Sequence, residues 1–173
     1  EKFIVVNRSQ PRLDQMREMV AGQKTDIEVV YACNSNPLIN DVIMAALPDY
    51  SIVINSTGMG KDTPGSPVTN AGLFPCHGIA WEFNYRGELD FMHQALAQVE
   101  PRGVKVEDGW LYFVHGWTQV VAQVLHFDLL DRDQEVRLFA CHVGALVVGR
   151  ESQRKGLGFA HQHAAYRPVE LLE

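Results

Sequence analysis

The sequence lacks several features that would point to whole classes of protein. No apolar run approaches membrane-spanning length without interruption. The formal net charge is −6 at pH 7, and no cluster of basic residues forms a nucleic-acid-binding footprint. The first residues resemble neither a signal peptide nor a transit peptide. We therefore expect no nucleic acid and no membrane among the partners, and a cytoplasmic location.

Cysteine is also scarce. Cys33, Cys76 and Cys141 are an odd number without metal-like spacing, so we expect them to be reduced and to fill small buried apolar positions. His161 and His163 could bind a metal from one face of a strand, but no further ligand is near them in the sequence. We expect these two histidines in an exposed tail, and no metal site.

Hydrophobic residues make up 46% of the 173 residues, which is enough for one globular domain with a core. Apolar runs that read as strands alternate with helical patterns, which is typical of an α/β fold with a doubly wound, parallel, Rossmann-like sheet. Residues 1–130 are expected to form this domain, and residues 131–173 a C-terminal helix and tail. Strands are predicted at 3–7, 27–32, 51–55, 78–83 and 104–106, and helices from Ser9 onward and at 35–47, 88–99 and 109–126.

The apolar residues of the early helices indicate which sides are expected to face a core. In the helix that begins near Ser9, these residues recur at helical spacing. They are Leu13, Met16 and Val20 in that helix, and Leu38, Ile39, Val42, Ile43 and Ala46 in the helix at 35–47.

A glycine-rich turn between the first strand and the first helix is absent from this chain. A dinucleotide-binding fold normally opens with such a strand and turn, and the chain starts at what reads as the second strand. Gly156 and Gly158 are no substitute, because no strand precedes them. We expect the sheet to lack its first strand and to pack against residues outside this chain or another copy of it.

The most informative segment is 52–60, where a short apolar strand ends in Asn-Ser-Thr and Gly-Met-Gly follows. In open α/β sheets, ligands bind outside the carboxyl ends of the strands, and small residues let them approach the backbone. The loop at 58–70 is long enough to indicate function. The alternative is a strand followed by an ordinary turn.

The end of the first predicted strand carries Asn7-Arg8-Ser9 and no acid. At the second strand of a dinucleotide-binding fold, an acid reads the ribose of NAD, whereas a basic residue accommodates the 2′-phosphate of NADP. Arg8 can bind a phosphate through its guanidinium fork. This pattern predicts NADP, and the alternative is a solvated arginine at a helix start.

Taken in order, these motifs resemble the cofactor-binding half of the shikimate/quinate dehydrogenase family, over about residues 2–126. Val6 to Ser9 is similar to its Asn-Arg-Thr segment. Residues 54–60 with 66–68 resemble its Asn-Ala-Thr, Gly-Met and Ser-Pro-Leu stretch. Residues 81–87 resemble the strand that ends in Asp-x-x-Tyr-Asn-Pro, and residues 106–109 the Asp-Gly turn before its C-terminal helix.

The resemblance implies hydride transfer between NADP(H) and a cyclic hydroxy or keto acid such as shikimate or quinate, as in aromatic amino acid biosynthesis. It places Tyr85 on the substrate side. The cofactor-binding residues that it implies are Asn7, Arg8 and Ser9 for the adenosine phosphate, Ser56, Thr57, Gly58 and Met59 for the nicotinamide and ribose side, and Gly109 against the nicotinamide.

The sequence departs from the family in two places. Arg86-Gly87 stands where the family has Asn-Pro. The family's substrate-binding Gln falls on Gly116, so Gln119 or His115 is expected to take that role.

The family's catalytic Lys/Asp pair belongs to an N-terminal substrate domain, so no catalytic residue is assigned here and we expect the chain alone to be inactive. Lys61-Asp62 is expected to face solvent. We expect a small-molecule substrate, and as further partner the missing substrate domain or another subunit, a homodimer included. The alternative is a non-catalytic nucleotide-binding or assembly module derived from the family.

Overall fold

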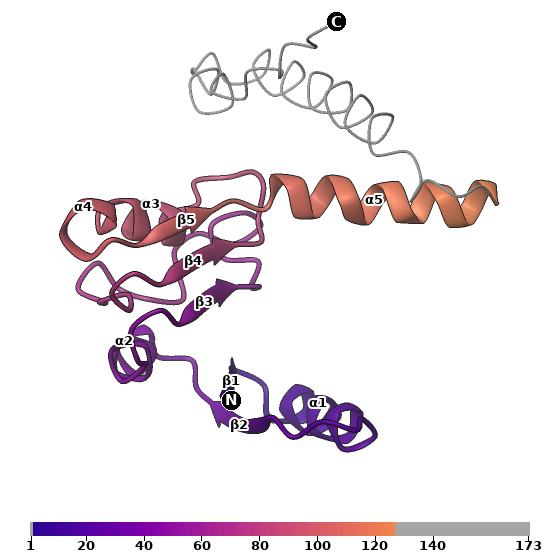
Figure 1. Cartoon of the computed structure of the whole chain (residues 1–173), viewed down its shortest axis with the longest axis horizontal. Helices are drawn as coiled ribbons and strands as arrows, with labels where there is room; N and C mark the ends of the chain where they lie inside the picture. The colour runs from indigo at the N-terminus through magenta and orange to yellow at the C-terminus, as the bar shows by residue number, and fades with distance from the viewer. Residues whose placement is uncertain (1, 127–173) are drawn as a thin grey trace, which may run out of the picture. The chain divides into compact units, whose positions relative to one another are not determined.

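The structure, a computed structural model, describes residues 2–126 (Figure 1). The chain divides into two compact units, Glu1–Phe113 and Val114–Glu173, and each is described by itself. The expected tail at 131–173, with Cys141, His161 and His163, lies outside the described residues.

Strands and helices alternate along the described chain, and every predicted strand is present within one or two residues of its expected bounds. The order is β1 (Lys2–Asn7), α1 (Gln10–Ala21), β2 (Glu28–Cys33), α2 (Pro37–Ala45), β3 (Ile52–Asn55), β4 (Ile79–Glu82), α3 (Asp90–Leu96), α4 (Val99–Arg102), β5 (Lys105–Glu107) and α5 (Trp110–Leu125).

The helix predicted at 88–99 is present as α3, which ends at Leu96, and a second short helix, α4, begins at Val99. They separate at Gln98, whose backbone has left the helical region. Its side-chain amide donates to the carbonyl of Gly72 at 2.8 Å and accepts from the amide of Phe74 at 3.0 Å. A tertiary contact with the preceding loop thus coincides with the break in the helix, and helical periodicity alone could not show it.

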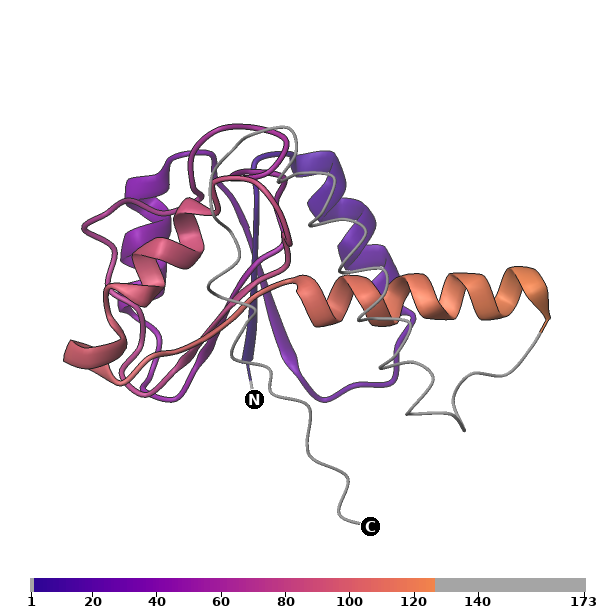
Figure 2. The same ribbon diagram turned by 90° about the horizontal axis from the view of Figure 1, so that it is seen from above.

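All strand pairs are parallel, and helices lie on both sides of the strands. β1 pairs with β2, and β4 lies between β3 and β5. Figure 2 shows the strands in the middle, α1 on one side and α2 and α3 on the other. This arrangement confirms the predicted α/β class with a parallel, Rossmann-like sheet.

The strands form two sheets, because no ladder joins β1 to β3. In a doubly wound sheet of order 3-2-1-4-5-6, the first strand lies between the second and the fourth. If β1 corresponds to the second strand and β3 to the fourth, the break falls at the place of the first strand. Among residues 2–126, the division into two sheets is therefore what the predicted lack of that strand would give.

The core lies on the α3 side of the three-stranded sheet. Phe74 and Phe91 are fully buried and pack edge to face, with ring centroids 5.2 Å apart. Ala80 in β4 and Val104 before β5 are also buried. Because alternate residues of a strand point to opposite faces, Glu82 shares the buried face with Ala80. The other members of the cluster are Met44, Val68 and Ala95.

Two predictions of burial are wrong. α2 turns Met44 into the core, whereas Leu38, Ile39 and Val42 are 61%, 49% and 69% exposed. The spacing of apolar residues identified an apolar side of this helix, but the packing partner selected a different one. Cys33 is exposed and Cys76 half-buried, so the expectation of buried cysteines fails for the first.

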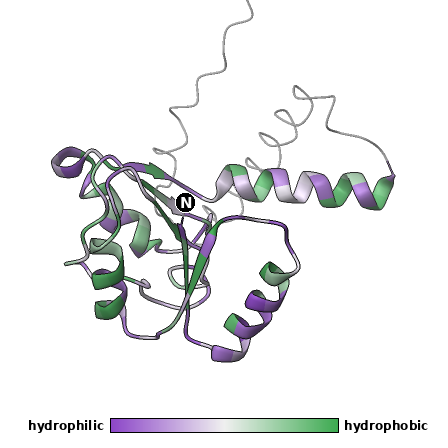
Figure 3. Ribbon diagram, turned by 60° about the horizontal axis from the view of Figure 1, so that its bottom comes forward, coloured by the Kyte–Doolittle hydropathy of each residue, from purple (hydrophilic) through white to green (hydrophobic). Residues whose placement is uncertain are grey.

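Hydrophobic and hydrophilic residues are interspersed along α5 (Figure 3). Within the described range, no helix combines the length and the apolar character that crossing a bilayer requires.

Candidate functional site

Three buried polar side chains meet where β3 and β4 end: Asn55, Glu82 and Asn84, which are 1%, 0% and 6% exposed. Asn55 and Glu82 are paired residues in the parallel register, so the end of each strand brings them side by side. The Asn55 amide donates to Glu82 Oε2 at 2.7 Å. The backbone N–H and side-chain amide of Asn84 donate to Glu82 Oε1 at 2.8 and 2.7 Å.

The Glu82 carboxyl is buried without an ion-pair partner among residues 2–126. Burial raises the pKa of this carboxyl, and the hydrogen bonds from Asn84 and Asn55 oppose that rise. A buried charge is costly unless its oxygens receive hydrogen bonds. Here amide donors take the place of a cation.

The network holds the loop that follows β3. Asn55 Oδ1 accepts from the backbone N–H of Thr57 at 3.0 Å and from its hydroxyl at 2.7 Å. The Thr57 hydroxyl in turn accepts from the Met59 N–H at 3.2 Å. Asn84 reaches the same loop, since its amide donates to the carbonyls of Thr57 and Met59 at 2.9 and 3.2 Å. The hydroxyl of Thr57 is therefore engaged in building the loop.

The loop after β4 interlocks with the loop after β3. The Leu89 N–H donates to the Gly60 carbonyl at 3.2 Å. Gly87 has φ +103°, and a Cβ there would lie 2.1 Å from the Gly60 oxygen. Only glycine fits this close approach. The contact between the two loops therefore explains why glycine stands at position 87, where the family has proline.

Two cations lie beside Tyr85 at this edge. Lys61 Nζ is 6.0 Å from the centre of the Tyr85 ring, and the Arg86 guanidinium carbon is 5.9 Å from it. Asp62 pairs with both, at 3.1 Å from Lys61 and 3.7 Å from Arg86. Asp62 is 58% exposed, but the Lys61 side chain is only 24% exposed. The Asp62 side chain therefore faces solvent as expected, whereas the Lys61 side chain is only partly exposed.

Aromatic rings pack around the start of α5. Tyr85 stacks on Phe113 with centroids 3.9 Å apart, and Trp110 lies within 6.3 Å of Tyr85. Gly109 begins this turn, and a Cβ there would lie 2.1 Å from the Phe83 carbonyl oxygen. Close packing of the turn on the end of β4 therefore requires glycine at position 109, whatever ligand contact it makes.

Arg8 lies at the carboxyl end of the other sheet. Its side chain is exposed, and no hydrogen bond or ion pair of its guanidinium is found within residues 2–126. Asn7 Oδ1 accepts from the Ser9 N–H at 2.9 Å, which shapes the turn into α1. Ser9 occupies the expected N-cap position of α1, but its side chain makes no capping hydrogen bond.

A chain of amides connects the two carboxyl-end regions. Asn34, just past β2, donates to Asn40 Oδ1 at 2.6 Å, and Asn40 donates to the Pro67 carbonyl at 2.7 Å. Pro67 belongs to the long loop after β3. These hydrogen bonds join the segment that follows β2 to the long loop that follows β3.

The remaining predicted site residues differ in their surroundings. Ser56, Thr57 and Gly58 are exposed and Met59 is half-buried, so the tip of the loop is accessible. Gly58 has no positive φ, and a Cβ there would meet only ordinary contacts at 3.7 Å. Gln119 and His115 are exposed on α5 within the second unit, and the structure does not test their expected role.

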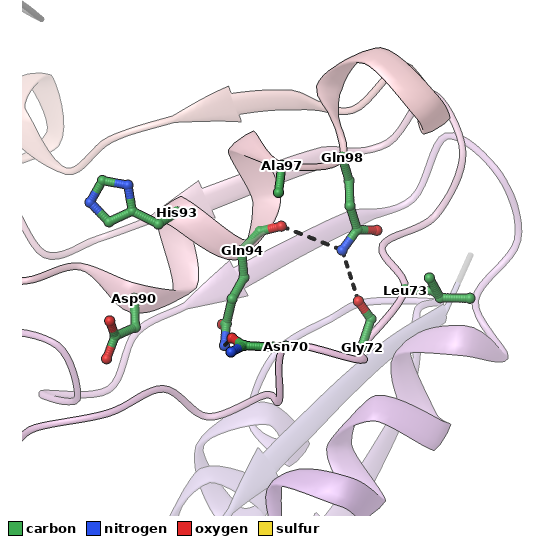
Figure 4. A pocket seen from close by; sticks show the side chains of 8 residues that line it. All are labelled: Asn70, Gly72, Leu73, Asp90, His93, Gln94, Ala97 and Gln98. Carbon is green, nitrogen blue, oxygen red and sulfur yellow. Dashed lines mark hydrogen bonds between the residues drawn. The ribbon is translucent and has the colours of Figure 1, made fainter.

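A pocket of about 390 Å³ lies away from these residues, between the 70–73 loop and α3 (Figure 4). Two of its lining residues, Gln94 and Gln98, use their amides to bind the backbone of the adjacent loop, at 3.3 Å from the Val68 carbonyl and 2.8 Å from the Gly72 carbonyl. None of the predicted site residues lines it. We therefore interpret this pocket as a structural feature formed where the loop is attached to α3.

Sequence reasoning did not assign Asn55, Glu82 or Asn84 to the site. The signal available was a polar residue at the end of each apolar strand, Asn55 after Ile54 and Glu82 after Trp81. Across the described residues, no group of three potential metal ligands comes together.

Comparison with known proteins gives a relative that is similar in sequence. The chain is 26% identical over 116 residues to a protein described as shikimate dehydrogenase (NADP(+)) from Symbiobacterium thermophilum. The match covers 66% of this chain and 37% of that protein, so the chain spans well under half of its relative. No family model and no solved structure matches. The resemblance to the shikimate/quinate dehydrogenase family that the motifs predict is thus confirmed, and the chain is a Rossmann-like α/β protein similar to that family.

Proposed function

We propose that this chain is the NADP-binding portion of an oxidoreductase similar to shikimate dehydrogenase, with a cyclic hydroxy or keto acid as substrate. The bound cofactor would carry the hydride, and the residues of this chain bind and orient it. The acid/base groups then come from residues outside the chain, so we expect no turnover by these 173 residues alone.

Arg8 is the observation that carries the proposal. It is an exposed cation at the carboxyl end of a parallel strand, and no acid stands beside it in Asn7-Arg8-Ser9. A guanidinium matches two phosphate oxygens, whereas a ribose 2′-hydroxyl calls for an acid at this place. The donor set therefore fits the 2′-phosphate of NADP.

The loop at 56–59 suits the nicotinamide side. Its exposed tip is made of small residues, and neither backbone conformation nor packing requires glycine at position 58. A ligand lying against the loop accounts for a residue without a side chain there. Beyond the loop, Lys61 and Arg86 flank Tyr85 and share one acid, Asp62, so the positive charge in excess favours a substrate that carries a carboxylate.

Calorimetric titration of the protein that contains this chain with NADPH and NADH tests the proposal. We expect NADPH to bind more tightly than NADH, and Arg8→Ala to lower the NADPH affinity about 10- to 150-fold, since a hydrogen bond to a charged group contributes about 1.5–3 kcal/mol. Arg12→Ala is the matched control, because Arg12 is exposed one turn along α1. Binding of neither cofactor would instead favour a non-catalytic module.

A further inference from the structure

We propose that Glu82 is a positioning residue that orders the 57–59 loop for the nicotinamide half of the cofactor. This inference rests on the function proposed above and adds a role for a residue that touches no ligand. It is carried by the direction of the hydrogen bonds between Glu82, its two asparagine neighbours and the loop.

The carboxylate fixes which way both asparagine amides face. An ionised carboxylate only accepts hydrogen bonds, so each neighbouring amide must turn its NH₂ group toward it. Asn55 donates to Oε2 and Asn84 to Oε1, both at 2.7 Å. With its NH₂ group committed to Glu82, Asn55 presents its oxygen to the Thr57 N–H and hydroxyl.

The orientation of Asn84 reaches the loop in the same way. Its NH₂ group, turned toward Glu82, also lies within hydrogen-bonding distance of the carbonyls of Thr57 and Met59, so its two hydrogens are shared among three acceptors. Both ends of the 57–59 segment are therefore held by amides that Glu82 also binds, and the carboxylate helps to keep the Asn55 oxygen turned toward the loop. A loop held in one conformation binds a ligand without an added cost of ordering.

Because Glu82 is buried, its proposed role depends on its two acceptor oxygens more than on the shape of its side chain. Glu82 is 0% exposed, so no water replaces a lost acceptor. Glutamine has the same shape, but it has one acceptor oxygen and an NH₂ group that would face another donor. Aspartate is shorter but keeps two acceptor oxygens. If Glu82 positions the loop, the aspartate variant should bind NADPH more tightly than the glutamine variant. If Glu82 only fills space, the glutamine variant should bind NADPH more tightly.

The test uses the protein that contains this chain and compares two ligands by calorimetry: NADPH, and adenosine 2′,5′-bisphosphate, which carries only the adenosine half. We expect Glu82→Gln to lower the affinity for NADPH about tenfold and leave the bisphosphate affinity within about twofold. Glu82→Asp should retain more NADPH affinity than Glu82→Gln. Glu107→Gln is the matched control, because Glu107 is an exposed carboxylate on the neighbouring strand.

The outcomes separate the two proposals. Unchanged NADPH binding in Glu82→Gln, an equal loss of both ligands, or an aspartate variant weaker than the glutamine variant would overturn the positioning role and leave NADP binding intact. If Glu82→Gln does not fold, Glu82→Asp decides: NADPH affinity within about threefold of the parent supports the role, and a larger loss overturns it. A parent protein that binds neither ligand overturns the proposed function, and the positioning role with it.

Discussion

The carboxyl ends of the two sheets are built in opposite ways. At the end of β1, Arg8 is exposed, and within residues 2–126 it has no polar partner for its side chain. At the ends of β3 and β4, three buried polar residues bond to one another and to the loop above them. One end carries an exposed positive charge, and the other carries a loop that is held in shape by hydrogen bonds. This difference predicts separable effects on affinity and on stability.

The largest effect on stability is expected at the buried polar residues where β3 and β4 end. Glu82→Ala leaves the amides of Asn55 and Asn84 without their acceptor. Since each buried unsatisfied group costs about 1–3 kcal/mol, we expect a loss of about 3 kcal/mol or more in the free energy of unfolding, measured by urea denaturation. Glu107→Ala, at an exposed site, should stay within about 0.5 kcal/mol. Equal losses in the two variants would contradict a special role for the network.

The second-largest effect on stability is expected at the contact between the loops that follow β3 and β4. Gly87→Ala places a Cβ 2.1 Å from the Gly60 oxygen and forces alanine into positive φ. Overpacking and backbone strain together predict a loss of about 2–4 kcal/mol in the free energy of unfolding. Gly58→Ala is the contrasting variant, since its Cβ meets only ordinary contacts. It should keep the stability of the parent while NADPH affinity falls, and a stability loss like that of Gly87→Ala would show that position 58 is structural.

A smaller effect is expected from pH. Burial raises the pKa of Glu82 above its usual value of 4.5 in the folded protein. Between that value and the raised pKa, the folded state binds more protons than the unfolded state, so the free energy of unfolding falls as pH rises through this window. Urea denaturation across the window should show this fall in the parent protein and a shallower one in Glu82→Gln. The same slope in both proteins would mean that Glu82 does not titrate there.

The smallest effect on stability is expected at Arg8, where β1 ends. Arg8→Ala removes an exposed side chain without a polar partner in residues 2–126, so the free energy of unfolding should change by less than about 0.5 kcal/mol. A thermal melt measures this beside the calorimetric titration. A large destabilisation would mean that Arg8 supports the fold, and the contrast between the two ends would then fail.

The sequence allowed much of the fold to be predicted, and part of the candidate site. Apolar runs located the five strands because a buried strand needs side chains such as those of Val5 and Val53 over a short span. The break at Gln98 and the exposure of Leu38 could not be predicted in this way. Each depends on what packs against the helix, and that partner lies elsewhere in the chain.

By itself the sequence determined where strands begin and end, that they alternate with helices, and that polar residues follow them. Those properties depend on neighbours a few residues away, so local spacing encodes them. Only the tertiary structure decided that Asn55 meets Glu82, 27 residues away, while Asn55 also binds the loop at Thr57. Strand pairing and register created that contact, and a parallel pair brings together residues that no local pattern links.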